Sequence, residues 1–188
     1  MNCKYKLKFF LKKLREDAVI AYPTEAVFGL GCNPDSQKAV RQLLSLKQRP
    51  IENGLILVAA DYQQIQPYID DDKLLSKQRE LIGSLWPGPI TLVLPAHPKT
   101  PSWITGRFSS VAVRVSNYPP VKELCRAFKR PLVSTSANFH GSPPCRSIKQ
   151  LRNQFGYQLL IYPGKVGSLQ HPTEIIDIFT GKIIRSGE

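Results

Sequence analysis

The chain has 188 residues, of which 42% are hydrophobic, and this suits a single globular domain over residues 1–188 with a sizeable core. No stretch approaches the roughly 18 consecutive apolar residues of a membrane-spanning helix, so no membrane protein is predicted. Lys and Arg number 26 against 14 Asp and Glu, which gives a formal charge of +12. So basic a chain predicts an anionic partner, such as nucleic acid, a phosphorylated ligand or acidic lipid.

Cysteine and histidine are scattered along the chain. They are Cys3, Cys32, Cys125 and Cys145, and His97, His140 and His171. The cysteines form no CxxC pair and the histidines no HExxH motif, so neither a disulfide framework nor a zinc site is predicted. We expect reduced thiols, a cytoplasmic protein and no structural metal.

The first segment, residues 4–16, predicts a basic amphipathic helix. Leu7, Phe10, Leu11 and Leu14 recur at helical spacing, and the other faces carry lysines and an arginine. A membrane-surface helix or a transit peptide has a similar pattern. Because this segment runs directly into a strand without a cleavage-like linker, a first helix packed on a sheet is favoured.

The stretch VIAYPTEAVFGLGC at residues 19–32 predicts a short strand that ends at Pro23 and leads into a turn with exposed backbone. Thr24 and Glu25 follow the strand's carboxyl end, where open α/β sheets place ligands. We interpret this turn as the first wall of a site.

A second helix is predicted from the cap residue Ser36 through Leu46. Its buried stripe continues to Lys47, and a lysine at such a position snorkels or points into a cavity. Lys47 and Arg49 also lie at the helix C-terminus, beside the negative end of the macrodipole. Helix capping and anion binding are equally good interpretations of this pair.

The middle of the chain alternates strands and helices. The predicted strands are 54–60, 90–94 and 111–115, with a short helix after Asp61 and another over 71–85 whose Leu74, Leu81, Ile82 and Leu85 face inward. Arg114 lies within an apolar strand, so we expect it to meet an anion or a carboxylate. Residues 97–110 form a long polar loop, the first candidate for a segment that closes over a site.

The last third completes an α/β pattern. Proline opens a helix at 119 or 120 that places Cys125 in the core, and a strand at 131–133 breaks into Ser134–Asn138. These small polar residues could present hydroxyls and backbone N–H groups to phosphate or carboxylate oxygens, or form a plain turn. A helix at 147–155, a strand at 159–162 and a hairpin at 174–185 follow.

Cations and hydroxyls therefore collect at the ends of the central strands. The residues are Thr24, Lys47, Arg49, Arg114, residues 134–138 and Arg185. Such a set describes a pocket for a polyanionic small molecule. The chain has neither GxxxxGK[ST] nor GxGxxG, so it is neither a P-loop protein nor a Rossmann nucleotide binder.

Five motifs in chain order carry a resemblance to a known family. They are YPTEAVFGLG, Lys47-Gln48-Arg49 followed by Pro50, WPGP at 86–89, AVRV at 112–115 and STSAN at 134–138. Together they resemble the YrdC/Sua5/YciO family, over essentially the whole chain and most closely its short bacterial members. The resemblance implies an α/β fold: a single-domain twisted open mixed sheet with flanking helices around a large basic concave site.

The resemblance also implies an activity. L-threonine, bicarbonate and ATP are joined into threonylcarbamoyl-AMP with release of pyrophosphate, and the product serves the threonylcarbamoyladenosine modification at position 37 of tRNA. The implied partners include downstream tRNA threonylcarbamoyl-transfer proteins, with tRNA or other RNA on the basic surface. Mg²⁺ is implied as a companion of ATP, carried by the phosphates without a dedicated protein metal site.

The family motifs assign roles residue by residue. The implied catalytic set is Lys47, Arg49, Ser136 and Asn138, and the implied threonine contacts are Thr24, Arg114, Ser134 and Thr173. The implied ATP contacts are Arg49, Asn53, Ser110, Ser136, Pro144 and Arg185. The transfer needs positioning and cations against developing negative charge, so the lack of a Ser-His-Asp or Cys-His set is consistent with it.

Other functions are compatible with the sequence. A YciO-like paralogue would have the same pocket with a different activity, and a nucleotide carrier would bind ATP without releasing pyrophosphate. An RNA-binding module would explain the charge, but RNA-binding domains usually show aromatic stacking motifs such as RNP1, and the sequence shows none.

Overall fold

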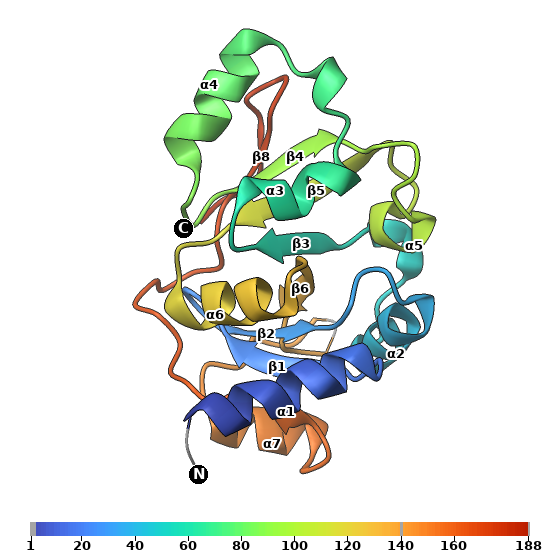
Figure 1. The fold of residues 1–188 in the computed structure, drawn as a ribbon. Helices are drawn as coiled ribbons and strands as arrows, with labels where there is room; N and C mark the ends of the chain where they lie inside the picture. Colours follow the sequence, from blue (N-terminus) through green and yellow to red (C-terminus); the bar gives the residue numbers. More distant parts are fainter. Residues whose placement is uncertain (1–2, 140, 188) are drawn as a thin grey trace.

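Nine strands in residues 3–139 and 141–187, the part of the chain that this computed structural model describes, form one mixed sheet (Figure 1). Their order is β7-β1-β2-β6-β3-β5-β4-β8-β9, with parallel pairs β7–β1, β3–β5 and β4–β8 and antiparallel pairs elsewhere. The strands are β1 Ile20–Pro23, β2 Phe28–Gly31, β3 Ile56–Ala59, β4 Thr91–Pro95, β5 Ser110–Val115, β6 Leu132–Ser136, β7 Leu160–Ile161, β8 Ile175–Asp177 and β9 Ile183–Arg185. The expected open mixed sheet is confirmed.

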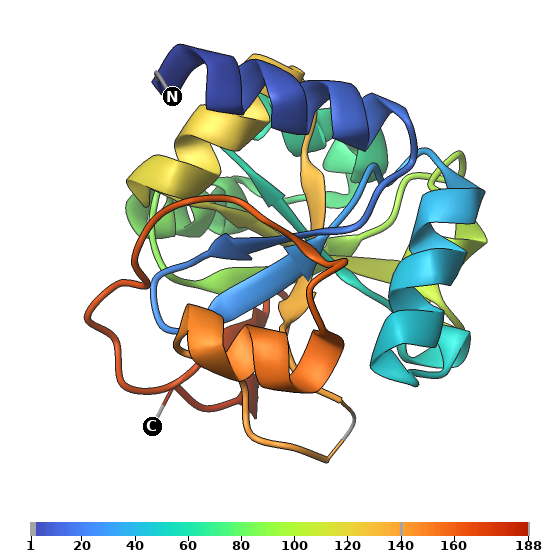
Figure 2. The same ribbon diagram turned by 90° about the horizontal axis from the view of Figure 1, so that it is seen from below.

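Helices pack on both faces of the sheet. They are α1 Cys3–Arg15, α2 Gln37–Lys47, α3 Tyr62–Ile65, α4 Ser76–Leu85, α5 Ser102–Thr105, α6 Pro119–Phe128 and α7 Ile148–Phe155, with short 3-10 turns η1 Ile51–Asn53, η2 Gln66–Tyr68 and η3 Asp71–Lys73. Helices α1 and α6 lie side by side (Figure 2) and bury Leu14 and Val121 against Val58 of β3. Helix α2 buries Leu43 against the opposite face, where Leu57 points.

Local chemistry sets the helix ends as the sequence predicts. The Ser36 hydroxyl accepts a hydrogen bond from the Ala39 N–H at 3.1 Å and so caps α2. Proline occupies the first turn of α6, and Ser147 and Gln150 form a capping box at α7. Cys125 is fully buried on α6, and burial raises the pKa of its thiol to about 12, so its predicted place in the core is confirmed.

The predicted turn after Pro23 is wrong in its second half, because Phe28–Gly31 forms strand β2 and pairs with β1. Glycine has a low strand propensity, which hides this strand in the sequence. The packing explains Gly31: a Cβ there would lie 2.5 Å from the Val133 carbonyl oxygen and 2.6 Å from Cε1 of Tyr22. Close approach of two neighbouring strands therefore requires a residue without a side chain.

Gly31→Ala is accordingly expected to lower the free energy of unfolding by about 2 to 3 kcal/mol, because the backbone oxygen of Val133 cannot yield as a side chain would. Urea denaturation checks this value. Gly83→Ala is the matched control: apart from the chain around it in α4, no described residue has an atom within 4 Å of a Cβ at Gly83, so alanine there is expected to stabilise the helix by about 0.5 to 1 kcal/mol. Equal effects of the two substitutions would contradict the role given to Gly31.

Three predicted boundaries also need correction. The helix expected over 71–85 is interrupted, because the Gln78 side chain accepts from the Leu75 N–H at 2.9 Å and caps the start of α4 there. Leu81, which was expected to face inward, is 39% exposed. The loop expected over 97–110 contains α5. Strand β6 continues to Ser136, beyond the expected end at 133, because residues 134–136 still pair with neighbouring strands.

Within residues 3–139 and 141–187, no helix is long and apolar enough to cross a bilayer. The same residues contain no group of three or more His, Cys, Asp or Glu side chains able to hold a metal ion. His140 lies outside the described residues.

Candidate functional site

One row of side chains across the sheet forms the floor of a cavity. Strand pairing places Ser134 beside Ile56, Ile56 beside Ala112, Ala112 beside Val93, and Val93 beside Asp177. Because side chains alternate between the faces of a strand, neighbours in one row share a face. All five line a cavity of about 520 Å³, a size typical of small-molecule sites.

The residues expected at ATP and in the catalytic set gather at this cavity. Those that line it are Lys47, Arg49, Asn53, Ser110, Ser136, Asn138 and Arg185. Pro144 is not among the lining residues. Its neighbour Cys145 accepts from the Phe28 N–H and donates to the Ala137 carbonyl, which ties this segment to β2 and to the end of β6.

Lys47 reaches from the last turn of α2 to the end of β6 and is only 4% exposed. Its ammonium donates to the Ser136 carbonyl at 2.6 Å and to Oδ1 of Asn138 at 2.8 Å. The Ser136 hydroxyl also donates to Oδ1 of Asn138, at 2.7 Å. Burial, together with the charge of Arg49, lowers the pKa of Lys47 to about 8. Lys47, Ser136 and Asn138, three of the four predicted catalytic residues, thus share one hydrogen-bonded network that contains a titratable cation.

Helix capping is the wrong interpretation of Lys47. Gln48 is the C-cap of α2, in the left-handed conformation with φ of 53°, and its N–H donates to the carbonyls of Leu44 and Ser45. Lys47 donates across to β6, and its placement in a cavity wall, one of the expected alternatives, is confirmed.

Arg49 contributes a second cation to the cavity wall. Its guanidinium donates to the carbonyls of Asn53 and Gly54, at 3.3 and 3.0 Å, and burial lowers its pKa. Its Nε is buried without a hydrogen-bond partner among the described residues. A buried donor of this kind is costly unless an acceptor reaches it.

The residues expected at threonine line a smaller pocket of about 40 Å³. They are Thr24, Arg114, Ser134 and Thr173, joined by the small or apolar residues Ala26, Val27 and Gly29. This pocket shares Ile56, residues 134–136 and Arg185 with the larger cavity. The two hollows therefore adjoin along β6, and ligands in them would meet at Ser134–Ser136.

Arg114 lies two residues along β5 from Ala112 on the same face, and only 4% of it is exposed. Its Nη1 donates to the hydroxyls of Thr173 at 2.7 Å and Thr91 at 3.2 Å. Its Nη2 lies 3.5 Å from Oε2 of Glu25, so the expectation that a mid-strand arginine meets a carboxylate is confirmed. The sequence placed Glu25 in a wall of the site without giving it a role, although it directly follows Thr24.

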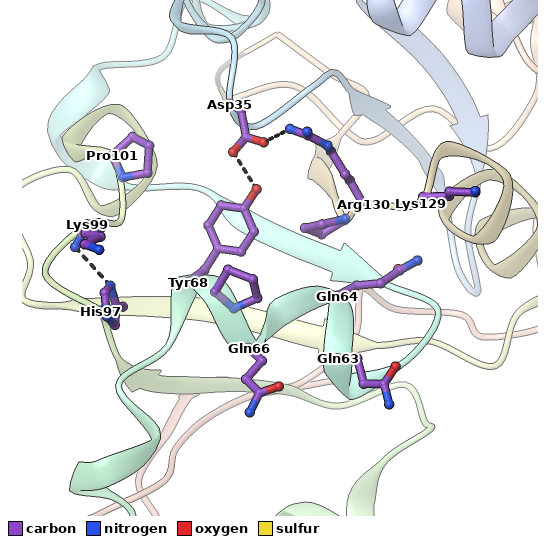
Figure 3. Close-up of a pocket in the computed structure, with 12 residues that line it drawn as sticks. Asp35, Gln63, Gln64, Gln66, Tyr68, His97, Lys99, Pro101, Lys129 and Arg130 are labelled. Atoms are coloured by element: carbon purple, nitrogen blue, oxygen red, sulfur yellow. Dashed lines mark hydrogen bonds and ion pairs between the residues drawn. The ribbon is translucent and has the colours of Figure 1, made fainter.

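A hollow larger than these two lies elsewhere on the molecule. It measures about 780 Å³ and shares no lining residue with the other two. Figure 3 shows Tyr68 and Arg130 both directed at Asp35, with His97 and Lys99 across the opening. No residue predicted to act in catalysis or substrate binding lines it, and no sequence pattern indicates it, because its lining residues come from separate segments.

Comparison with known proteins decides the family. The Sua5_yciO_yrdC family model, described as telomere recombination, matches residues 12–187. The chain belongs to this family. A threonylcarbamoyl-AMP synthase of Yersinia enterocolitica is 58% identical over 177 residues, which cover 94% of this chain and 93% of that relative. The resemblance seen in the sequence motifs is thereby confirmed.

Solved structures of family members have the same fold. P. abyssi Sua5 complexed with L-threonine matches 92% of the chain with a TM-score of 0.83 and 31% identity. The chain covers 51% of that Sua5, so it spans about half its length. E. coli YciO matches 98% of the chain and 90% of its own length with a TM-score of 0.84; at 23% identity this shows the fold alone.

Proposed function

We propose that the larger cavity of this synthase holds ATP and the smaller pocket holds L-threonine, so that both reach the strand end at Ser134–Ser136. The threonylcarbamoyl-AMP synthase activity, a nucleotidyl transfer, is that of a relative aligned over more than nine-tenths of both chains. The observation that carries the assignment of the two substrates is the shared wall of the two hollows. An amino acid in the smaller pocket would lie next to the cations that would meet a triphosphate.

The proposed reaction has two steps, formation of a carbamate and its attack on ATP. The threonine amine and bicarbonate condense to a carbamate with loss of water, and a carbamate oxygen then attacks the α-phosphorus of ATP. The bond between the α-phosphorus and the bridging oxygen breaks, and pyrophosphate leaves with that oxygen. Lys47 and Arg49 stabilise the negative charge of the triphosphate as it shifts toward the leaving group, and no covalent enzyme intermediate is needed.

The threonine assignment rests on the charge and polarity of the side chains that line the smaller pocket. Arg114 supplies the cation for the amino-acid carboxylate, and Thr24, Ser134 and Thr173 supply hydroxyls around a small pocket. Ala26 and Val27 give the apolar part that a threonine methyl group would contact. The structure of P. abyssi Sua5 with L-threonine supports this choice of ligand.

Mg²⁺, RNA and the downstream proteins are further parts of the proposal. Asp177 is the carboxylate that lines the larger cavity within the described residues, so Mg²⁺ would enter with ATP, held mainly by the phosphates. The charge of +12 supports contact with tRNA or other RNA. The product would pass, in the cytoplasm, to proteins that transfer the threonylcarbamoyl group to tRNA.

Pyrophosphate release from ATP by the purified protein tests the proposal. We expect release that requires both L-threonine and bicarbonate. ATP binding without release would favour a nucleotide carrier or a YciO-like paralogue, and RNA binding without ATP binding would favour an RNA-binding module.

The pKa of Lys47 predicts how ATP affinity depends on pH. The lysine must be a cation to attract the triphosphate, and its pKa is lowered to about 8, so affinity is expected to be full below pH 8. Above pH 8 it should fall, by at most about tenfold per pH unit, until the pH exceeds the higher pKa that Lys47 has beside bound ATP. Titration of ATP binding between pH 6.5 and 9.5 without threonine measures this, and Lys47→Arg, which stays charged, should remove the decline. A flat wild-type profile would contradict the prediction.

A further inference from the structure

One buried cation, Arg114, and one buried carboxylate, Glu25, face each other beside the smaller pocket. Arg114 is 4% exposed and Glu25 is 6% exposed. Burial and the charge of Arg114 together lower the pKa of Arg185, which shares the pocket wall. Glu25 does not line either substrate hollow, so its carboxylate acts on the site through Arg114.

The carboxylate of Glu25 is fixed from one side. The Ser116 hydroxyl donates to its Oε1 at 2.6 Å, whereas Nη2 of Arg114 lies 3.5 Å from its Oε2. Ser116 is fully buried just after β5, where its N–H donates to the Ala59 carbonyl. The shorter contact of the Glu25 carboxylate is therefore with the buried Ser116 hydroxyl, and its ion pair with Arg114 is the longer one.

The backbone of Glu25 is held as well. Its carbonyl accepts from the Leu169 N–H at 3.1 Å, and the Thr24 carbonyl accepts from the Gly167 N–H at 2.9 Å. A Cβ at Gly167 would lie 2.4 Å from the Glu25 oxygen, so the two segments touch along their backbones. Glu25 is thus anchored at both its main chain and its side chain.

The contacts of Arg114 leave its Nε without a partner among the described residues. Two hydroxyls accept from Nη1 and Glu25 faces Nη2, whereas Nε is buried with no hydrogen-bond partner among the described residues. Nε and Nη2 are the pair of guanidinium nitrogens that bind a carboxylate side-on with two hydrogen bonds.

We infer that Glu25, held by Ser116, is a positioning residue that fixes the Arg114 guanidinium so that Nε and the second hydrogen of Nη2 can donate to the carboxylate of the amino-acid substrate. The inference rests on the proposed threonine site and adds a residue that the family motifs did not assign to it. A carboxylate suits this position because it holds the guanidinium by charge. At 3.5 Å, with its other oxygen held by Ser116, it does not neutralise Arg114 fully.

Binding of L-threonine and of L-threoninamide, which lacks the carboxylate charge, tests the inference in wild type and Glu25→Gln. We expect Glu25→Gln to weaken L-threonine binding about tenfold and to change L-threoninamide binding less than twofold. Ser116→Ala keeps the charge of Glu25 but removes the hydroxyl that holds its carboxylate. We expect this variant to bind L-threonine about threefold more weakly and L-threoninamide almost as well as wild type does. Glu123→Gln is the matched control, since Glu123 accepts from the Tyr162 hydroxyl away from both hollows, and it should change neither affinity.

Other binding results would contradict either the role given to Glu25 or the proposed threonine site. Equal weakening of both ligands would show a merely structural role for Glu25, and tighter L-threonine binding would show that Glu25 competes with the substrate. Unchanged binding in both variants would overturn the inference alone. A wild-type chain that binds neither compound would overturn the proposed threonine site itself. If Glu25→Gln does not fold, the loss of L-threonine affinity in Ser116→Ala, compared with its loss of L-threoninamide affinity, tests the inference instead.

Discussion

Replacing Lys47 with methionine is expected to lower kcat/KM for ATP by about 100- to 1000-fold, the usual cost of removing one preorganised group that stabilises transition-state charge. Methionine has nearly the length of lysine and removes only the charge and the donors. Lys47 is the buried cation that joins the end of α2 to Ser136 and Asn138, so its loss also leaves their oxygens without the shared donor. Steady-state pyrophosphate release at saturating threonine and bicarbonate measures the effect.

The control for this variant is Lys38→Met. Lys38 lies on the same helix but faces Asp17 at 3.8 Å on the surface, and an exposed pair of this kind contributes little. We expect its kcat/KM to stay within about twofold of wild type. A Lys47→Met enzyme with wild-type kcat/KM would mean that Arg49 and Arg185 stabilise the charge of the triphosphate without Lys47.

Two cations of the site, Lys47 and Arg114, could be predicted from the sequence because each stands out in a local pattern. Lys47 continues the apolar stripe of α2 by one heptad step, which alone indicates that it is buried, and Arg114 stands out as a charge within an apolar strand. The residues that hold Arg114 are harder to see. Thr91, Thr173 and Glu25 lie on separate segments, and the pairing of β4 with β5 and β8, together with the turn after β1, brings them together.

The fold shows the same division between local and long-range information. Caps and apolar periodicity predicted most helices, because these signals act within a few residues. The strand Phe28–Gly31 was missed because its glycines are required by Tyr22 and by Val133, a residue about 100 positions away. The sheet order, with β6 between β2 and β3, likewise depends on contacts between distant segments that no local pattern encodes.

Arg114→Met is expected to lower kcat/KM for L-threonine by about 100-fold, because two charge-assisted hydrogen bonds to the substrate carboxylate are lost. It should also lower the free energy of unfolding by about 3 to 5 kcal/mol, since Glu25 then stays buried without a counter-charge. Adding Glu25→Gln to this variant removes the unpaired charge and should recover most of the stability while threonine turnover stays low. Urea denaturation and threonine titrations of the single and double variants separate the two effects.

The exposed Arg126 of α6 provides the control, and Arg126→Met is expected to change neither stability nor threonine kcat/KM appreciably. Recovery of threonine turnover in the double variant would contradict the role given to Arg114, because it would mean that the single variant failed only through instability. Stability that stays low in the double variant would show that Arg114 supports the fold through Thr91 and Thr173 rather than through Glu25. Because the two readouts respond to different partners of one guanidinium, the pair of variants separates its role in substrate binding from its role in the fold.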